Sequence, residues 1–375
     1  MIGRKHLVAL AVGIAYLLPA GAAHAQSLKS PKSGDPQVKS IEAISFGPNG
    51  LLLIGDGKGR QVVAVDTQDT APKKLSKTEI PNIADELAGR IGTTGKGIEI
   101  IKLAVNPASQ TAYFAIRKMD DKKDLLLTLN ADGKVREFTL DNVKHVRVPL
   151  PTDVKVVKIT DITWAGDRVL VAVQASDTFA SKFVSIMAPL AGDTRCDCVS
   201  AETYHVAHSN WETRAPIRTA IPYEENGKKY LVGAFTCTPI VKYSLDDLKS
   251  GGKVKGQSII EIGSGNEPRD MFVYEKKGKK YILMSMNRFH HKRKPVGPSP
   301  HWAVRVDFDL LAENEKVNKK ALVRVDRNYE SVTDRAQVMP DYHGVVHMDR
   351  LDDNRALIVR TDDKGRLDLT AVPLP

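Results

Sequence analysis

Three cysteines and two histidines form the first group of side chains that could bind a metal or react. The group consists of Cys196, Cys198, His205, His208 and Cys237. Thiolate and imidazole are ligands that copper and zinc prefer, so a metal site is one interpretation. The spacing matches no common zinc motif. In an exported protein, a disulfide from Cys237 to Cys196 or Cys198 is a second interpretation, and unreactive thiols are a third.

A second group lies in the segment 287–302, NRFHHKRKPVGPSPHW. The polar and basic side chains there that could hold a metal or an anion are Asn287, Arg288, His290, His291 and His301, next to Lys292–Lys294. The segment follows a run typical of a strand, and long loops on a rigid scaffold often carry function. We therefore interpret it as a lid over a binding site. A solvated basic loop without a ligand is the alternative.

A third group combines carboxylates with cations at the starts of successive strand-like runs. Its members are Glu42, Lys102, Asp161, Arg218, Arg269 and Asp270. If these starts meet around one pore, the group could bind an anion or a metal ion. The alternative is that the charges neutralise one another and hold the sheets together.

Two histidines near the C-terminus, His343 and His347, add a possible acid or base. They lie four residues apart in a run typical of a strand, and even spacing places two side chains on the same strand face. We take His343, His347 and Asp270 as the candidate catalytic residues. A buried histidine without a catalytic role is the alternative.

The elements that would position these groups are short strands in a repeating pattern. In Ile41–Thr67, three apolar runs are separated by Gly-Pro-Asn-Gly and Asp-Gly-Lys-Gly-Arg, which is typical of strands joined by tight turns. Similar units begin at Ile41, Ile100, Ile159, Ile217, Pro268 and His343. Such spacing predicts an all-β protein, a β-propeller with six blades. A seventh blade around Ala321–Val325 is the alternative.

The chain divides into three predicted parts. Residues 1–25 have the basic start, apolar run and Ala-His-Ala ending of a cleavable signal peptide. Residues 26–39 are rich in Ser, Pro, Lys and Gly, which predicts a flexible leader, although Gln37–Lys39 could add a closing strand. Residues 40–375 form a single propeller domain. Within it, Ile83, Leu87 and Ile91 predict a short helix inserted after the first blade.

The opening blade, FGPNGLLLIGDGKGRQVVAVD, resembles the NHL and gluconolactonase-like six-bladed propellers. In gluconolactonase-like enzymes, a glutamate that opens the first blade binds a divalent cation together with an asparagine and an aspartate. The resemblance implies that Glu42, Asn287 and Asp270 form such a site, and that the chain is a metal-dependent lactone or ester hydrolase.

Composition and motifs narrow the possible functions. The chain has 55 Lys and Arg against 45 Asp and Glu, but the basic residues are scattered over predicted turns, so nucleic acid is not an expected partner. We expect a periplasmic or secreted protein without a membrane span after cleavage. Its predicted function is to bind a small anionic ligand or a metal ion (Ca, Zn or Cu) at the channel mouth. The alternatives are the hydrolase, a redox subunit that uses copper or belongs to a quinone dehydrogenase, and a platform for a protein partner.

Overall fold

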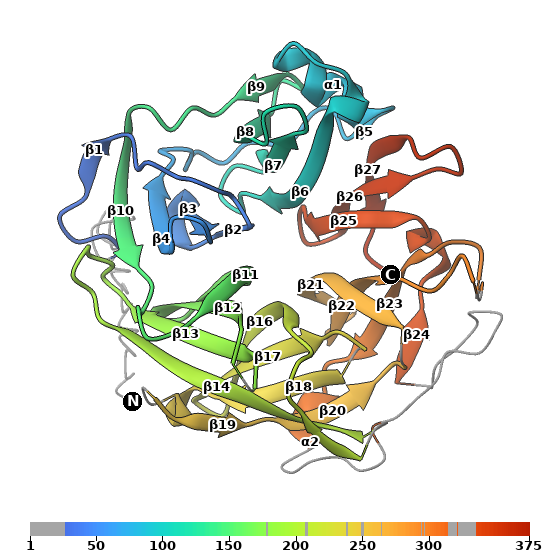
Figure 1. Ribbon diagram of the computed structural model, residues 1–375. Helices are drawn as coiled ribbons and strands as arrows, with labels where there is room; N and C mark the ends of the chain where they lie inside the picture. The colour runs from blue at the N-terminus through green and yellow to red at the C-terminus, as the bar shows by residue number, and fades with distance from the viewer. Residues whose placement is uncertain are drawn as a thin grey trace, which may run out of the picture.

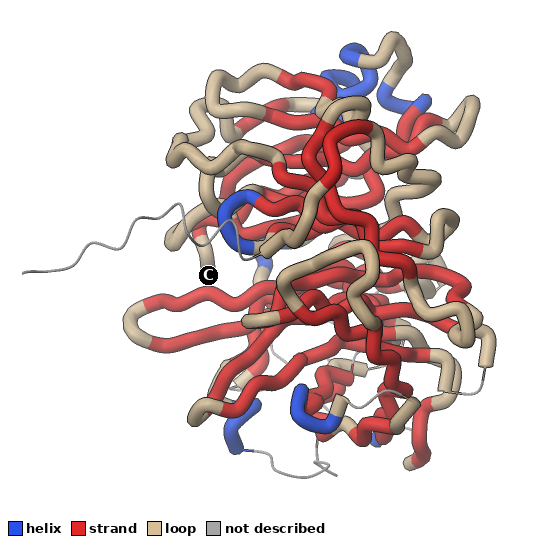
Figure 2. Tube along the Cα trace, turned by 90° about the vertical axis from the view of Figure 1, so that its left-hand side faces the viewer, coloured by secondary structure: helices blue, strands red, loops and turns tan. Residues whose placement is uncertain are grey.

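The computed structural model shows a ring of β-sheets. It describes residues 27–375 except for Thr178, Ala207, His208, Thr238, Lys249, Ser250, Ser264, Lys294, Val296, 314–320 and 322–334. The predicted signal peptide therefore lies outside the described residues. Strands make up most of the described trace (Figure 2). None of the helices in the described part is long and apolar enough to cross a bilayer.

Six sheets form the blades of the propeller, and we number them by the order of their innermost strands in the chain. Blade 1 contains β2 (Ala43–Phe46), β3 (Leu51–Asp56), β4 (Gln61–Asp66), β10 (Val143–Pro149) and β1 (Lys32–Gly34). Blade 2 contains β6 (Ile98–Val105), β7 (Ala112–Lys118), β8 (Asp124–Leu129) and β9 (Val135–Glu137). Blade 3 contains β11 (Val156–Ala165), β12 (Arg168–Ala175), β13 (Ser181–Met187), β14 (Cys196–His205), β15 (Asn210–Glu212) and β19 (Lys253–Lys255).

The other three blades follow in the C-terminal half of the chain. Blade 4 contains β16 (Ile217–Glu225), β17 (Lys228–Phe235), β18 (Pro239–Ser244) and β20 (Gln257–Glu261). Blade 5 contains β21 (Asn266–Lys276), β22 (Lys279–Arg288), β23 (His301–Asp307) and β24 (Ala336–Val338). Blade 6 contains β25 (Val345–Arg350), β26 (Arg355–Thr361), β27 (Leu367–Pro373) and β5 (Glu79–Ile80). The prediction of six blades is confirmed.

The long interval before the last blade belongs to blade 5. It contains β23, α2 (Leu310–Glu313) and β24, and β24 pairs with β23. Ala321 is buried, and residues 322–325 of the proposed seventh blade lie outside the described residues. The predicted helical insertion is also found, as α1 (Ile83–Arg90) with Ile83 and Leu87 buried.

The blades do not follow one another around the ring in chain order. Neighbouring innermost strands are β6 and β2, β2 and β11, β11 and β16, β16 and β21, β21 and β25, and β25 and β6. Blade 2 therefore lies between blades 6 and 1 (Figure 1). Two strands belong to blades that are distant from them in the sequence. Strand β10 follows blade 2 in the chain but pairs with β4 of blade 1. Strand β5 precedes blade 2 in the chain but pairs with β27 of blade 6.

The pairing of β4 with β10 agrees with the burial of β4. Val62–Val65 of β4 are fully buried, so the strand requires another strand on its outer edge. Strand β10 provides it, and its Val146 and Val148 are buried in return. Within the segment 26–39, expected to be a flexible leader, β1 extends the same sheet by pairing with β10.

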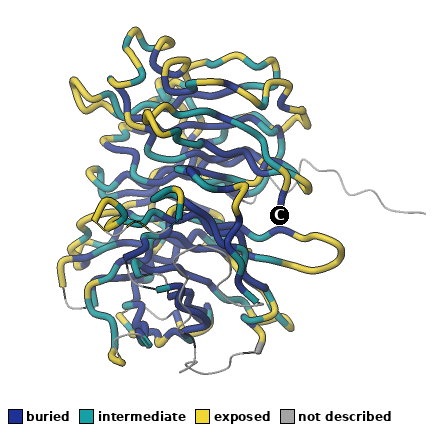
Figure 3. Tube along the Cα trace, turned by 90° about the vertical axis from the view of Figure 1, so that its right-hand side faces the viewer, coloured by how far each residue is buried: buried dark blue, intermediate teal, exposed yellow. Residues whose placement is uncertain are grey.

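The core lies between neighbouring blades. Residues on both faces of the strands are buried, whereas exposed residues gather at the turns (Figure 3). This explains why the inner strands show continuous apolar runs instead of a strict alternation. The blades are thus a rigid scaffold around a central channel.

Candidate functional site

The central channel has a cavity at each end. The first residues of the inner strands line one of about 700 Å³, which we call the start-side cavity. The later residues of the same strands line another of about 430 Å³, which we call the end-side cavity. Lys102 and Asp270 line both, so they mark where the two cavities meet.

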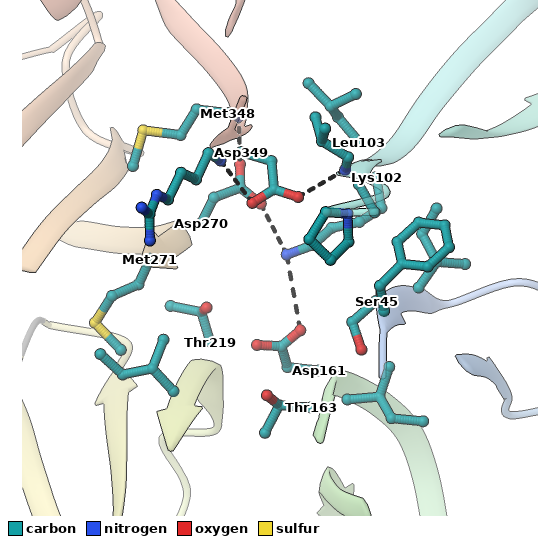
Figure 4. A pocket seen from close by; sticks show the side chains of 18 of the residues that line it. Ser45, Lys102, Leu103, Asp161, Thr163, Thr219, Asp270, Met271, Met348 and Asp349 are labelled. Carbon is teal, nitrogen blue, oxygen red and sulfur yellow. Dashed lines mark hydrogen bonds and ion pairs between the residues drawn. The ribbon is translucent and has the colours of Figure 1, made fainter. Parts of the chain in front are cut away.

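Lys102 lies across the channel between two carboxylates. Its Nζ is 2.7 Å from Oδ1 of Asp270 on blade 5 and 3.7 Å from Oδ1 of Asp161 on blade 3 (Figure 4). Burial would lower the pKa of Lys102, but the attraction of Asp270 and Asp161 outweighs it and raises the pKa. Lys102 therefore stays charged and connects three blades.

Four carboxylates of the channel cavities, and Asp124 on β8, also join neighbouring blades. In each case a carboxylate oxygen accepts a hydrogen bond from a backbone N–H of the next blade. The pairs are Asp124 with Ile41 (2.8 Å), Glu42 with Ile159 (2.7 Å), Asp161 with Ala220 (2.8 Å), Asp270 with Met348 (3.0 Å) and Asp349 with Val105 (2.7 Å). At the sixth junction, Arg218 of blade 4 forms an ion pair at 3.0 Å with Glu267 of blade 5. For the carboxylates, the structure therefore favours the alternative interpretation, in which these charges hold the sheets together.

Burial changes the acidity of these carboxylates. It raises the pKa of Glu42 and of Asp161, despite the hydrogen bonds that each accepts. It also raises the pKa of Asp349 to about 6. Desolvation penalises the charged form, so these acids hold a proton at a higher pH than an exposed carboxyl does.

Cations are in excess in the start-side cavity. Its charged lining residues are Lys96, Lys102, Arg117, Lys158, Arg218 and Arg269 against Glu42, Glu99, Glu267 and Asp270. In the end-side cavity the balance is reversed, with Lys102 and Arg350 against Asp161, Asp270, Asp349, Asp352 and Asp353. The two mouths of the channel thus differ in charge.

Most of the start-side carboxylates already have partners. Glu42 and Asp270 accept backbone hydrogen bonds, and Glu267 lies 3.0 Å from Arg218 and 3.7 Å from Arg269. By contrast, Lys96 and Lys158 are exposed and form no ion pair within the part of the chain that the structure describes. An anion entering this mouth would meet cations that are available for binding.

The predicted lid lies beside the start-side cavity and does not line it. The segment 287–302 connects β22 to β23, and the N–H of Gly344 donates to His301 O at 2.8 Å. Burial, and then repulsion from Arg269, His347 and His291, lower the pKa of His301 to about 4. His290 is exposed, whereas Asn287, Arg288 and His291 are half-buried. Lys294 lies outside the described residues.

The two candidate histidines occupy different places. His347 is buried in β25 and lines the start-side cavity. His343 precedes that strand, directly after the single turn Pro340–Tyr342, because β25 begins only at Val345. Their even spacing therefore does not place them on one strand face.

The metal site implied by the family resemblance does not fit the described residues. Glu42 and Asp270 line the start-side cavity, but Asn287 does not. Each carboxylate already accepts a backbone hydrogen bond, and Asp270 also pairs with Lys102. Among the described residues, no group of three or more His, Cys, Asp or Glu side chains is arranged to hold a metal ion.

The cysteine and histidine group is spread over two blades. Cys196 and Cys198 lie on β14, and none of the three cysteines forms a disulfide in the structure. Burial raises the pKa of both Cys196 and Cys198 to about 11, so these thiols stay protonated at neutral pH. His205 is buried near Glu212 and Glu261, at 3.6 and 3.4 Å. His208 lies outside the described residues.

Sequence reasoning missed several residues of the site. Glu267 and Lys158 lie next to predicted site residues at the starts of inner strands, so their position was the available signal. Asp349 follows the candidate residue His347 by two positions on the same strand, β25. Asp124 opens a third strand, and its contact with Ile41 depends on the unusual order of the blades.

Comparisons with known proteins assign no family and no activity to the chain. No protein-family profile and no curated protein matches the chain. A GH43 endo-arabinanase from Bacillus licheniformis is 14% identical over 71% of this chain and 90% of its own, with a TM-score of 0.35. The PQQ-bound aldose sugar dehydrogenase from Streptomyces coelicolor is 10% identical over 92% and 99%, with a TM-score of 0.33. The plexin A4 extracellular region is 9% identical over 92% of this chain and 40% of its own, with a TM-score of 0.44.

Proposed function

We propose that this propeller binds a small organic anion in its start-side cavity. The observation that carries the proposal is the charge of the lining, which has six cationic side chains and four carboxylates, and in which Lys96 and Lys158 form no ion pair among the described residues. Three of those carboxylates are engaged in hydrogen bonds or ion pairs. The opposite mouth has the reverse charge balance, so an anion should enter from the start side.

The cations best placed for the ligand are Lys158 and Arg269. Both are exposed at the mouth, and Arg269 is held only loosely by Glu267 at 3.7 Å. A carboxylate bound there would form charge-assisted hydrogen bonds, which are shorter and stronger than those between neutral groups. Arg218 lies deeper, where burial lowers its pKa, and Glu267 orients it.

Export to the periplasm or the exterior is the second part of the proposal. It rests on the basic, apolar and Ala-His-Ala pattern of residues 1–25. Cell fractionation and N-terminal sequencing of the native protein test it, with Gln26 as the expected first residue. The hydrolase, redox and protein-partner alternatives stay predictions, and the described residues provide no metal-ligand set for the first two.

Calorimetric titration with succinate at low and at high salt tests the anion site. We expect binding that weakens as salt rises, because exposed charges are screened. Arg269→Gln should weaken it about tenfold, since a hydrogen bond to a charged group contributes ~1.5–3 kcal/mol. Lys228→Gln, an exposed lysine at the opposite end of blade 4, is the matched control and should bind as the unaltered protein does. Equal losses in both variants, or salt-independent affinity, would contradict the proposal.

A further inference from the structure

His347 has one ring nitrogen without a partner at the inner end of the start-side cavity. Its Nε2 lies 3.0 Å from the carbonyl oxygen of Ile100. A carbonyl oxygen only accepts hydrogen bonds, so Nε2 must carry the proton and donate it. In the neutral ring, Nδ1 then has a free lone pair and acts as an acceptor. Within the described part of the chain, Nδ1 has no hydrogen-bond partner.

A second acceptor faces this lone pair. Oδ2 of Asp270 lies 3.8 Å from Nδ1 of His347 and accepts the backbone N–H of Met348 at 3.0 Å. Two acceptors at this separation repel each other unless a donor lies close to both. The residue His347 is 6% exposed and lines the start-side cavity, whereas its Nδ1 is buried, so a group that binds this nitrogen must enter to the inner end of the cavity. Burial also lowers the pKa of His347, which keeps the ring neutral and the lone pair available.

We propose that Nδ1 of His347, with the Asp270 carboxylate beside it, accepts the one hydrogen bond that a ligand hydroxyl can donate, so that the site selects hydroxylated organic anions. This rests on the proposed function, because the cations at the mouth would hold the charged end of the same molecule. An ammonium group could also donate there. However, Lys102 lies 2.7 Å from the same carboxylate, and Arg269 lines the same cavity, so a second cation would be repelled. A neutral hydroxyl has no such penalty.

Three dicarboxylates with one carbon skeleton test the inference: malate has a hydroxyl, succinate has none, and aspartate has an ammonium group. Titration of the full chain should give malate an affinity about tenfold higher than succinate, the upper range for one neutral hydrogen bond. Aspartate should bind more weakly than malate. His347→Phe keeps a ring of similar shape but has no ring nitrogen to accept a hydrogen bond, and should bring the malate-to-succinate ratio close to one. The ratio is the readout, because a general loss of affinity cancels in it.

A spectroscopic measurement covers the case in which the variant fails to fold. In the unaltered protein with ¹⁵N-labelled histidine, malate should shift the Nδ1 resonance of His347 and succinate should not. Equal affinity for malate and succinate, or a preference that survives His347→Phe, would overturn the inference and leave the proposed function intact. Failure of all three ligands to bind would overturn both.

Discussion

Replacing Lys102 with methionine should destabilise the ring more than any other single change at the channel surface. Lys102 is 16% exposed and pairs with Asp270, which is 4% exposed. Methionine fills a similar volume but leaves Asp270 and Asp161 facing each other without their shared cation. Removing one partner of a buried ion pair typically costs about 3–5 kcal/mol. We expect the free energy of unfolding to fall by about that amount at pH 8.

The loss in the free energy of unfolding of Lys102→Met should increase as the pH rises. Burial already raises the pKa of Asp161, and without the positive charge of Lys102 this pKa should rise further above its unfolded value. Such groups stabilise the folded state when protonated, and that contribution disappears as the pH rises through the folded-state pKa. The deficit of Lys102→Met should therefore be larger at pH 8 than at pH 5.

Urea unfolding followed by tryptophan fluorescence measures the effect at both pH values. The double variant Lys102→Met/Asp270→Asn is the control, because it removes one of the two uncompensated charges and should recover part of the stability. A loss below about 1 kcal/mol, the range of surface ion pairs, would refute the reasoning. So would a deficit that shrinks as the pH rises.

Three further predictions concern other parts of the ring. Burial raises the pKa of Asp349 to about 6, so the stabilising protonated form is lost as the pH rises. Asp349→Asn should therefore reduce the change in the free energy of unfolding between pH 4 and 7 by up to about 3 kcal/mol. Urea unfolding across that range checks this, and an unchanged pH dependence would contradict it. Glu42→Ala should lower the free energy of unfolding by about 1–3 kcal/mol, because the N–H of Ile159 loses its acceptor. Glu42→Gln keeps an acceptor oxygen and should lower the free energy of unfolding by less. Equal losses in the two variants would count against the role of this hydrogen bond. Thiol titration of the denatured chain without reductant should find all three cysteines reactive, and a count of one would show that a disulfide forms.

The repeat pattern was enough to predict the blades, because each inner strand carries a long apolar run next to turn residues. The starts predicted at Ile100, Ile159, Ile217 and Pro268 lie within the inner strands β6, β11, β16 and β21. The order of the blades around the ring could not be predicted. It depends on β10 and β5, which are short and pair with strands from other units. Such non-local pairings leave no periodic signal in the sequence.

The sequence pointed to charged residues of the channel but not to their contacts. Glu42, Lys102, Arg218, Arg269 and Asp270 line the start-side cavity, whereas Asp161, expected at the same mouth, lines the end-side cavity. The sequence could not show that Glu42, Asp161 and Asp270 each accept a backbone N–H from the next blade, because that contact depends on the packing of two sheets. The cysteine group illustrates the reverse case, where residues close in sequence do not form a site among the described residues.

A crystal structure of the protein soaked with succinate tests the central claim most directly. We predict that the carboxylates of succinate lie in the start-side cavity, in contact with Arg269 and Lys158. Density for succinate in the acidic end-side cavity, or an empty start-side cavity in crystals where succinate binds elsewhere, would contradict the account.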